Sequence, residues 1–247
     1  MLAVSEMFYS IQGEGVSVGQ PSVFFRLKGC NLMCGGYGTQ ITKQLSNGAT
    51  WRCDTIETWM KGEKLTKKQI CEHWVANGWI EKLKEGAHLI ITGGEPLLQQ
   101  VEIISFLEYL ETKYSVVPFI EIETNGTISA ISELDQRVSQ YNVSLKLPNS
   151  GMNKNDFLKK QSVKDFVKNA KSLFKFVIST KDDIDLCLSL YINPFDIDHK
   201  KVLLMPATDT KASLKIMEKK VVEWCKLYNF RYSQRLHISI WGQKTGI

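Results

Sequence analysis

The chain of 247 residues lacks several features that define whole classes of protein. No apolar run approaches the roughly 20 residues that a membrane-spanning helix needs. The N-terminal residues MLAVSEMFYSIQGEG contain no basic stretch followed by an apolar stretch, so we expect no secretory signal. No internal repeat, low-complexity tract or Pro/Gly/Ser-rich linker divides the chain, and we expect a single domain over residues 1–247. These absences predict a cytoplasmic protein with no membrane partner.

A strong excess of one charge is also absent, since 31 Lys and Arg stand against 26 Asp and Glu. The apolar fraction of 43% and charged fraction of 23% exclude a disordered, collagen-like or coiled-coil protein. Much of the positive charge lies in a lysine-rich stretch from Lys146 to Lys181. A solvated helix face explains this stretch best, and a weak surface for an anionic ligand or nucleic acid is the alternative. We expect no direct nucleic-acid partner.

Short apolar and β-branched runs predict strands at 22–27, 88–92, 118–123, 143–147, 173–178, 202–205 and 236–240. Helical patterns lie between them, at 66–84, 99–113, 128–138, 164–170 and 211–228. Strands that alternate with helices predict an α/β fold with a mainly parallel sheet. In such sheets the chemistry lies at the carboxyl ends of the strands.

Polar or glycine-rich signals follow several of these strands directly. They are Lys28–Cys30, Thr92–Glu95, Thr124–Gly126 and Met205–Pro206, and we expect them to gather along one rim of the sheet. Glycines in the TGGEP segment let the backbone approach a ligand, and Glu95 offers a carboxylate to a ligand ammonium group. The alternative for this segment is an ordinary turn in which Pro96 starts a helix.

The six cysteines do not suggest three disulfides in a reducing compartment, so ligand roles come into consideration. Cys30 and Cys34 are separated by three residues, and Cys53 follows a glycine-containing excursion that can fold back toward them. Three thiolates suit an iron–sulfur cluster with one open iron, whereas structural zinc needs four ligands and the chain has no CxxC pair. The alternative is buried thiols without chemistry, which we prefer for Cys71, Cys187 and Cys225.

Taken together, GCNLMC, the CDT at 53–55 and TGGEP resemble the core of radical S-adenosylmethionine enzymes. The segments SIQGEG, VFFRLKGCNLMC, ETNG, LMP and RLHISIWGQKTGI narrow the resemblance to the 7-carboxy-7-deazaguanine synthase family of 7-deazapurine (queuosine-type) biosynthesis. This resemblance runs from Ser10 to the C-terminus. It implies a partial, incomplete α/β barrel of the TIM type, a homodimer, a [4Fe–4S] cluster, S-adenosylmethionine and Mg²⁺.

One departure from the family pattern concerns the cluster loop. The usual ligand spacing is CxxxCxxC, but here 18 residues separate Cys34 from Cys53, and Thr50 stands where a CxxC pair would begin. Cys34 then becomes the middle ligand, and we expect an enlarged cluster loop at about 31–60.

The resemblance implies a role for each matching residue. Cys30, Cys34 and Cys53 hold the cluster, and Thr55 offers its hydroxyl to Mg²⁺. The residues implied to line S-adenosylmethionine are Arg52, Asp54, Gly94, Glu95, Ser144, Lys146, Met205, Pro206 and Thr208. Those implied to bind a pterin are Ile11, Gln12, Gly13, Glu14 and Thr92, with Arg26 on the substrate carboxylate and the C-terminal carboxylate of Ile247 nearby.

Simpler interpretations stand beside these roles. Arg26 can form a structural ion pair, Glu14 can serve a turn between two glycines, and a threonine such as Thr55 often follows an aspartate without any role. We expect His237 to be a structural histidine on the last predicted strand.

The implied reaction starts when an external, flavodoxin-like donor reduces the cluster and S-adenosylmethionine is cleaved. The resulting radical takes hydrogen from 6-carboxy-5,6,7,8-tetrahydropterin, whose ring contracts with loss of ammonia to give 7-carboxy-7-deazaguanine. Two other functions stay open. One is a different radical S-adenosylmethionine enzyme such as a glycyl-radical activase, and the other is a zinc-stabilised nucleic-acid-binding protein that uses the lysine-rich stretch.

Overall fold

Alternating strands and helices build one curved, open sheet, and the computed structural model describes residues 1–244 and 246. In this part of the chain the sheet has nine strands in the order β3-β1-β2-β4-β5-β6-β7-β8-β9. The strands are β1 (Leu2–Ile11), β2 (Pro21–Leu27), β3 (Glu63–Leu65), β4 (His88–Gly93), β5 (Ile120–Thr124), β6 (Gln140–Ser144), β7 (Ser172–Ile178), β8 (Val202–Pro206) and β9 (Arg231–Tyr232). All neighbours from β2 to β9 are parallel, whereas β1 is antiparallel to both β2 and β3. This confirms the predicted fold class.

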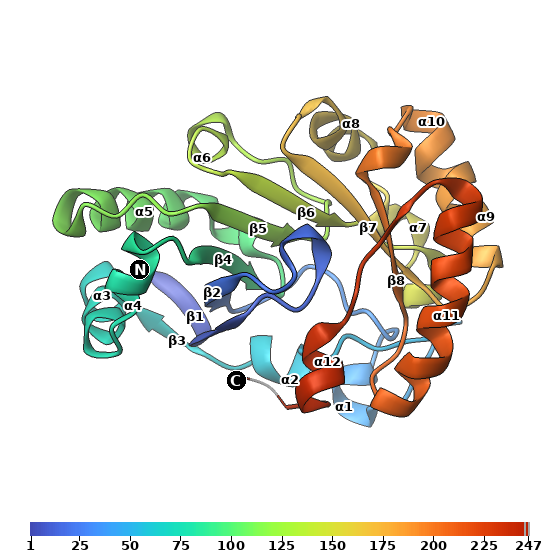
Figure 1. Cartoon of the computed structure of the whole chain (residues 1–247), viewed down its shortest axis with the longest axis horizontal. Helices are drawn as coiled ribbons and strands as arrows, with labels where there is room; N and C mark the ends of the chain where they lie inside the picture. The colour runs from blue at the N-terminus through green and yellow to red at the C-terminus, as the bar shows by residue number, and fades with distance from the viewer. Residues whose placement is uncertain (245, 247) are drawn as a thin grey trace.

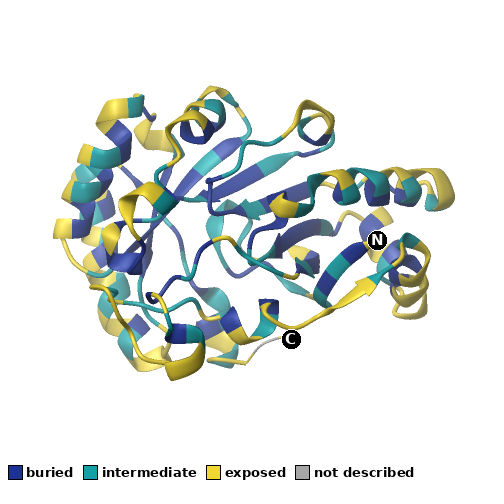
Figure 2. Ribbon diagram, turned by 180° about the vertical axis from the view of Figure 1, so that it is seen from behind, coloured by how far each residue is buried: buried dark blue, intermediate teal, exposed yellow. Residues whose placement is uncertain are grey.

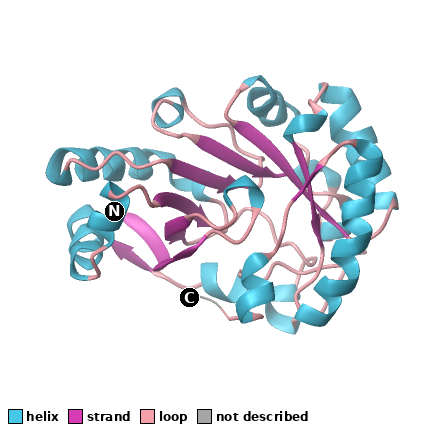
Figure 3. Ribbon diagram, viewed as in Figure 1, coloured by secondary structure: helices cyan, strands magenta, loops and turns pink. Residues whose placement is uncertain are grey.

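Helices surround the sheet, as Figures 1 and 3 show. They are α1 (Thr39–Thr42), α2 (Ile56–Trp59), α3 (Lys67–Ala76), α4 (Trp79–Lys84), α5 (Gln100–Tyr114), α6 (Ser132–Asp135), α7 (Lys154–Phe157), α8 (Lys160–Lys168), α9 (Asp182–Cys187), α10 (Asn193–Phe195), α11 (Lys211–Tyr228) and α12 (Leu236–Trp241). Figure 1 shows α12 beside α1 and α2, although the cluster loop and the C-terminal helix lie far apart in the sequence. No helix among the described residues is both long and apolar enough to span a membrane.

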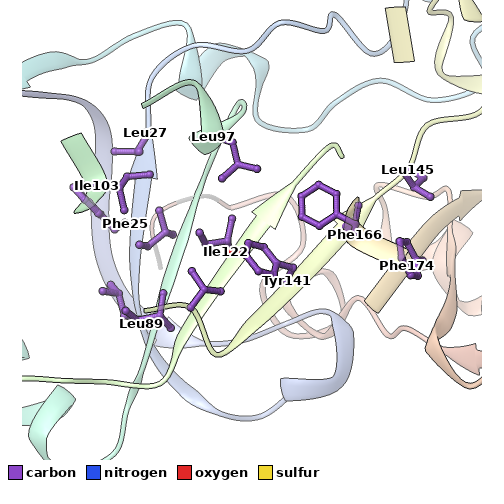
Figure 4. Close-up of a cluster of buried hydrophobic side chains, with 14 of the residues drawn as sticks. Phe25, Leu27, Leu89, Leu97, Ile103, Ile122, Tyr141, Leu145, Phe166 and Phe174 are labelled. Atoms are coloured by element: carbon purple, nitrogen blue, oxygen red, sulfur yellow. The ribbon is translucent and has the colours of Figure 1, made fainter. Parts of the chain in front are cut away.

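One face of the sheet is apolar because alternate residues of each strand point toward the helices. Phe25 of β2 packs on Trp74 of α3 and Phe106 of α5, with ring centroids 5.6 and 5.1 Å apart. Ile122 and Tyr141 continue this layer across the sheet (Figure 4). Each such buried side chain contributes about 1.5–3 kcal/mol to stability, so this layer fixes the sheet. Figure 2 shows that exposed residues are concentrated on the outer sides of the helices, away from this buried layer.

The opposite face of the same strands is polar. Glu123, Asn142 and Lys175 come from three consecutive parallel strands and line one pocket together with Arg26 and Thr92. Asn142 and Lys175 are flanked on both sides, and Glu123 on one side, by core residues that point to the helices, as the two-residue period of a strand requires. The concave side of the partial barrel is therefore chemically distinct from its packed side.

Several predicted elements differ from the observed ones. The strand predicted at 236–240 is wrong, because this segment is helix α12, whose Ser239 N–H donates to the carbonyl of Arg235 (3.2 Å). A short apolar run has no period that separates a strand from a helix, and here the segment closes over the pocket instead of extending the sheet. Consequently, His237 lies on a helix and not on a strand.

Strand β1 was not predicted, because its mixed polar and apolar residues face a pocket on one side. The helix predicted at 66–84 is two helices, since Gly78 adopts a left-handed conformation between α3 and α4. Its N-terminus has the expected capping box between Thr66 and Gln69. The helix predicted at 128–138 shortens to α6, and the strand predicted at 143–147 ends at Ser144.

Candidate active site

A pocket of about 760 Å³ opens where the parallel strands end. Its wall contains most of the residues that the sequence singled out: Ile11, Gln12, Gly13, Glu14, Arg26, Cys30, Cys34, Arg52, Cys53, Asp54, Thr55, Thr92, Gly94, Ser144, Lys146, Met205 and Thr208. Glu95 and Pro206 are not part of this wall. Ile247 lies outside the described residues.

The three cysteines of the predicted cluster line this pocket, and they come from the two ends of one long loop. The backbone N–H of Cys53 donates to the carbonyl of Cys34 at 3.1 Å, so the excursion between them does fold back. The Sγ of Cys30 accepts from the N–H of Leu32 at 3.4 Å. Cys71, Cys187 and Cys225 are buried thiols that do not line the pocket.

The enlarged loop is held by the loop that follows β6. The N–H of Gly35 donates to the carbonyl of Ser150 at 2.8 Å, and that of Thr50 donates to Asn149 at 2.9 Å. The indole of Trp51 donates to the side chain of Asn149 at 3.1 Å. Residues 35–52, which separate Cys34 from Cys53, form the insertion in the cluster loop. Both ends of this insertion are anchored to the loop after β6, close to the two cysteines.

The surroundings of the thiols combine low solvation with one positive charge. Burial raises the pKa of Cys30 to about 11 and that of Cys34 to about 12, and the ammonium of Lys146 opposes both shifts. The Nζ of Lys146 donates to Ser144 (2.8 Å) and lies 5.7 Å from the ring centre of Trp51. A cation at this position stabilises thiolates and would also attract a ligand carboxylate.

Among residues 1–244 and 246, no three Cys, His, Asp or Glu side chains converge closely enough to hold a single metal ion. A zinc site requires its thiolates within about 2.3 Å of one ion. Three thiols in the wall of one pocket agree with the three-thiolate ligand set of a cluster that has one open iron, and the described residues show no closed four-ligand zinc site.

Gly94 lets the end of β4 approach the cluster loop. A Cβ at this position would lie 2.3 Å from the carbonyl oxygen of Gly29 and 2.6 Å from the Cβ of Cys30. The next residue, Glu95, donates its N–H to that same carbonyl at 2.8 Å. The glycine therefore serves a close approach to the backbone that carries Cys30.

The carboxylate of Glu95 has a structural environment that the sequence did not predict. It is fully buried and accepts from the hydroxyl of Thr124 (2.9 Å) and from the N–H groups of Asn125 (2.7 Å) and Leu97 (3.0 Å). Burial outweighs these donors and raises the pKa of Glu95 to about 7. In this arrangement Glu95 fixes the loop after β5, whose Asn125 reaches the Sγ of Cys30 at 3.8 Å.

A second polar group forms the substrate side of the pocket. The Oε1 of Gln12 accepts from the N–H groups of Gly13 (2.8 Å) and Glu14 (3.2 Å), and its Nε2 donates to Glu123 (3.2 Å). The hydroxyl of Thr92 donates to the other oxygen of Glu123 at 2.9 Å. Glu123 is thus held by two neighbours with its carboxylate at the pocket wall, where it can accept from an amino or N–H group.

Arg26 donates from Nε to Glu6 of β1 at 2.7 Å, and both side chains line the pocket. This ion pair matches the structural interpretation of Arg26, and it leaves the terminal nitrogens of the guanidinium for a further acceptor. Beside it, Phe8 and Phe24 stack with ring centroids 4.7 Å apart and supply an apolar wall. Strands β1 and β2 together therefore contribute both a charge pair and a flat apolar surface.

Glu14 belongs to a buried network of charges. Its carboxylate pairs with Lys175 (2.5 Å) and Arg235 (3.4 Å), and His237 lies 3.8 Å away. Burial alone would raise the pKa of Glu14, but the charges of Lys175, Arg235 and His237 hold it well below its usual range. Arg235 also pairs with Asp54 at 2.5 Å.

Sequence reasoning missed Glu123, Lys175 and Arg235 as pocket residues. The first two carried a signal, because Lys175 is the only charge in the largely apolar strand β7 and Glu123 alternates with isoleucines in β5. A charge in such a strand must face a ligand or a buried partner. Arg235 had no comparable local signal.

The remaining predicted residues lie around the cysteines and the end of β8. The Oγ1 of Thr208 is buried and has no hydrogen-bond partner among the described residues, so it can still bond a ligand. Thr55 places its hydroxyl 3.4 Å from the Sγ of Cys53. Arg52 is engaged by Glu57 (2.6 Å) and Thr39 (3.1 Å), which directs its charge away from the pocket centre.

Comparison with known proteins agrees with this geometry. A family model described as "4Fe-4S single cluster domain" matches residues 11–146. QueE from Escherichia coli has a TM-score of 0.60 at 22% identity, with 96% of this chain and 94% of that chain covered. Native anSMEcpe with bound AdoMet has a TM-score of 0.53 at 16% identity, with 83% and 60% covered. The family model, the shared fold and the cysteine-lined pocket define a protein of the 4Fe-4S single-cluster class.

More similar relatives specify the family. The 7-carboxy-7-deazaguanine synthase of Pyrobaculum aerophilum is 30% identical over 245 residues, covering 98% of this chain and 96% of the relative. That of Leptospira interrogans is 28% identical over 259 residues, covering 99% and 98%. This chain belongs to the 7-carboxy-7-deazaguanine synthase family.

Proposed function

We propose that this chain converts 6-carboxy-5,6,7,8-tetrahydropterin to 7-carboxy-7-deazaguanine with loss of ammonia. The observation that supports this proposal is one pocket whose wall contains three thiols, the guanidinium of Arg26 and the hydrogen-bonded pair Gln12 and Glu123. The proposed reaction requires one pocket that can hold the cluster, S-adenosylmethionine and a small, flat, polar substrate at the same time.

The pocket divides into two regions by chemistry. Cys30, Cys34 and Cys53 would hold the [4Fe–4S] cluster, and the unpartnered hydroxyl of Thr208 together with Lys146 would bond S-adenosylmethionine. Ser144, Met205 and Gly94 complete this side of the wall. When bound, the cluster and S-adenosylmethionine supply the radical that removes hydrogen from the substrate.

The protein's own task is to hold the substrate with its reacting carbon toward the cofactor. Glu123, oriented by Gln12 and Thr92, would accept from the amino and ring N–H groups of the pterin. Arg26 would receive the substrate carboxylate on its terminal nitrogens, a planar fit that lysine cannot reproduce. Phe8 and Phe24 would exclude water from one side of the ring.

Mg²⁺ is part of this proposal. Thr55 is the oxygen ligand that the chain itself would supply, and the substrate carboxylate and water would complete the shell. A threonine hydroxyl alone is a weak ligand, so this site forms only when substrate is present.

Two partners are proposed on the family resemblance: a flavodoxin-like electron donor and a second copy of the chain in a homodimer. The ends of the cluster-loop insertion are anchored close to Cys34 and Cys53 in sequence, and the insertion would contribute to the surface on which the donor docks.

The test is product formation by the anaerobic protein after reconstitution with iron and sulfide. The assay contains S-adenosylmethionine, Mg²⁺, a reductant and the carboxypterin, and the product is identified by mass. Arg26→Met, which keeps the cluster ligands and removes the carboxylate fork, is the matched control. A protein that holds an intact cluster and cleaves S-adenosylmethionine yet forms no deazaguanine would refute the proposed function.

A further inference from the structure

Arg235 stands out among the pocket residues because the family resemblance implied no role for it and because it is almost fully buried (7% exposed). It immediately precedes α12, the C-terminal helix that replaces the predicted last strand. A buried guanidinium is costly unless all its donors find acceptors. The hydrogen-bond acceptors of the Arg235 guanidinium therefore indicate which segments this side chain holds in place.

Each part of the guanidinium reaches a different loop. Nη2 donates to the Oδ2 of Asp54 at 2.5 Å, Nε donates to the Oε1 of Glu14 at 3.4 Å, and Nη1 donates to the carbonyl of Thr208. These partners are 181, 221 and 27 residues away along the chain. One side chain thus joins the end of β1, the cluster loop and the loop after β8.

These three loops carry three different parts of the proposed site. Asp54 directly follows the cluster ligand Cys53, Glu14 belongs to the wall that faces the substrate, and Thr208 lies on the side proposed for S-adenosylmethionine. A movement of any of these loops must therefore stretch a hydrogen bond of Arg235.

The segment around Arg235 is itself tied to the substrate loop. The N–H of Leu236 donates to the carbonyl of Gly13 at 2.9 Å, and the N–H of Gly15 donates to the hydroxyl of Ser233 at 3.0 Å. A Cβ on Gly13 would lie 2.6 Å from the Nδ1 of His237, so this contact leaves no room to slide. Arg235 consequently moves with the loop that holds Glu14.

We propose that Arg235 is a positioning residue that couples substrate binding to the cluster, by fixing the loops of Glu14, Asp54 and Thr208 relative to one another. This inference rests on the proposed function for the identity of the ligands. Binding of the pterin against Glu14 then alters the environment of Cys53 through the Glu14–Arg235–Asp54 contacts.

Two substitutions distinguish the role of Arg235 in positioning the loops from the effect of its positive charge. Arg235→Lys keeps the positive charge, but a single ammonium lacks the fork that reaches three loops. Asp54→Asn leaves the contacts to Glu14 and Thr208 and removes only the charge on the cluster side. Both variants should fold, because Glu14 keeps its pair with Lys175 and the side chain of Asp54 is 47% exposed.

The experiment records the electron paramagnetic resonance signal of the reduced, S-adenosylmethionine-bound protein before and after addition of the carboxypterin. We expect the pterin to shift the wild-type signal and to leave that of Arg235→Lys and Asp54→Asn unchanged, with about four irons per chain in all three proteins. We also expect the KM for the pterin to rise about tenfold or more in Arg235→Lys and by a smaller factor in Asp54→Asn. Lys211→Gln is the matched control, since Lys211 donates to the carbonyl of Ile240 (2.9 Å) and supports α12 from outside the pocket.

A wild-type signal that ignores the pterin, or an Arg235→Lys signal that responds as the wild type does, overturns the inference. Product formation by the wild type is scored separately. If the pterin shifts the signal through Arg235 but no deazaguanine forms, the coupling stands and the proposed function fails.

Discussion

Replacement of Gly94 by alanine tests whether the end of β4 sets the position of the first cluster ligand. The new Cβ would lie 2.3 Å from the carbonyl oxygen of Gly29, whereas real contacts of this kind are not shorter than 3.0 Å. The two backbones must therefore separate by about 0.7 Å. The hydrogen bond from Glu95 N–H to that oxygen would then stretch from 2.8 Å to about 3.5 Å.

The expected cost has two parts. Overpacking at a backbone contact costs about 1–3 kcal/mol, and the lost hydrogen bond adds about 1 kcal/mol. The sum of about 2–4 kcal/mol corresponds to a fall in Tm of roughly 5–15 °C for a chain of this length. Because Cys30 directly follows Gly29, we also expect iron content to fall well below that of the wild type.

The assay is thermal unfolding of the metal-free protein together with iron and sulfide analysis after reconstitution. Gly48→Ala is the matched control in the cluster loop, since Gly48 has a φ of +73° and no atom within 4 Å of its added Cβ. It should cost about 1–2 kcal/mol through backbone strain alone and leave the iron content unchanged. If Gly94→Ala loads iron as Gly48→Ala does, the close approach at Gly29 does not position Cys30.

Three further outcomes follow from the site. Arg26→Lys should raise the KM for the carboxypterin about 10–100-fold with a smaller effect on kcat, because the bidentate contact is lost; equal loss in both parameters would contradict a binding role. Cys53→Ala should lower the iron content after reconstitution while Cys71→Ala should not, and equal iron in the two variants would remove Cys53 from the cluster. Burial alone would raise the pKa of Glu14, but its charged neighbours, Lys175 foremost, hold the pKa in the folded protein below its usual range. The ionised Glu14 therefore stabilises the fold above the unfolded pKa of about 4.5, and this stabilisation is lost as the pH falls below that value. Urea unfolding should therefore show Glu14→Gln less stable than the wild type at pH 7, with the two curves converging in acid; a constant difference across pH would refute this.

Much of the fold could be predicted because the parallel strands have a clear sequence pattern. Runs such as HLIIT are apolar on their helix-facing side, and the glycine or polar residue that follows each run marks the carboxyl end. The division of the cysteines into a cluster group and buried thiols also came from the sequence, and the structure places only the first group in the pocket. Sequence spacing alone indicates this division because the three predicted cluster ligands lie at the two ends of one loop.

The rest depends on contacts between distant segments. The segment LHISI resembles a strand by composition, but it is a helix that follows Arg235, whose side chain contacts the distant residues Asp54 and Glu14. The carboxylate of Glu95 is oriented by Thr124 at the end of β5 and by Asn125 directly after it. No spacing within TGGEP reveals which donors its carboxylate will meet.

The anchoring of the insertion also has a consequence for the order in which this protein is assembled. Gly35 and Thr50 are held by the carbonyls of Ser150 and Asn149, so the last two thiols receive their final spacing only after the sixth strand and its loop have been synthesised. At 5–20 residues per second, the roughly 100 residues between them take roughly 5–20 s to leave the ribosome. During that interval a nascent chain displays thiols that cannot yet share a cluster. The final geometry of the cluster loop therefore depends on the segment that follows β6, although all three thiols lie in the first quarter of the chain.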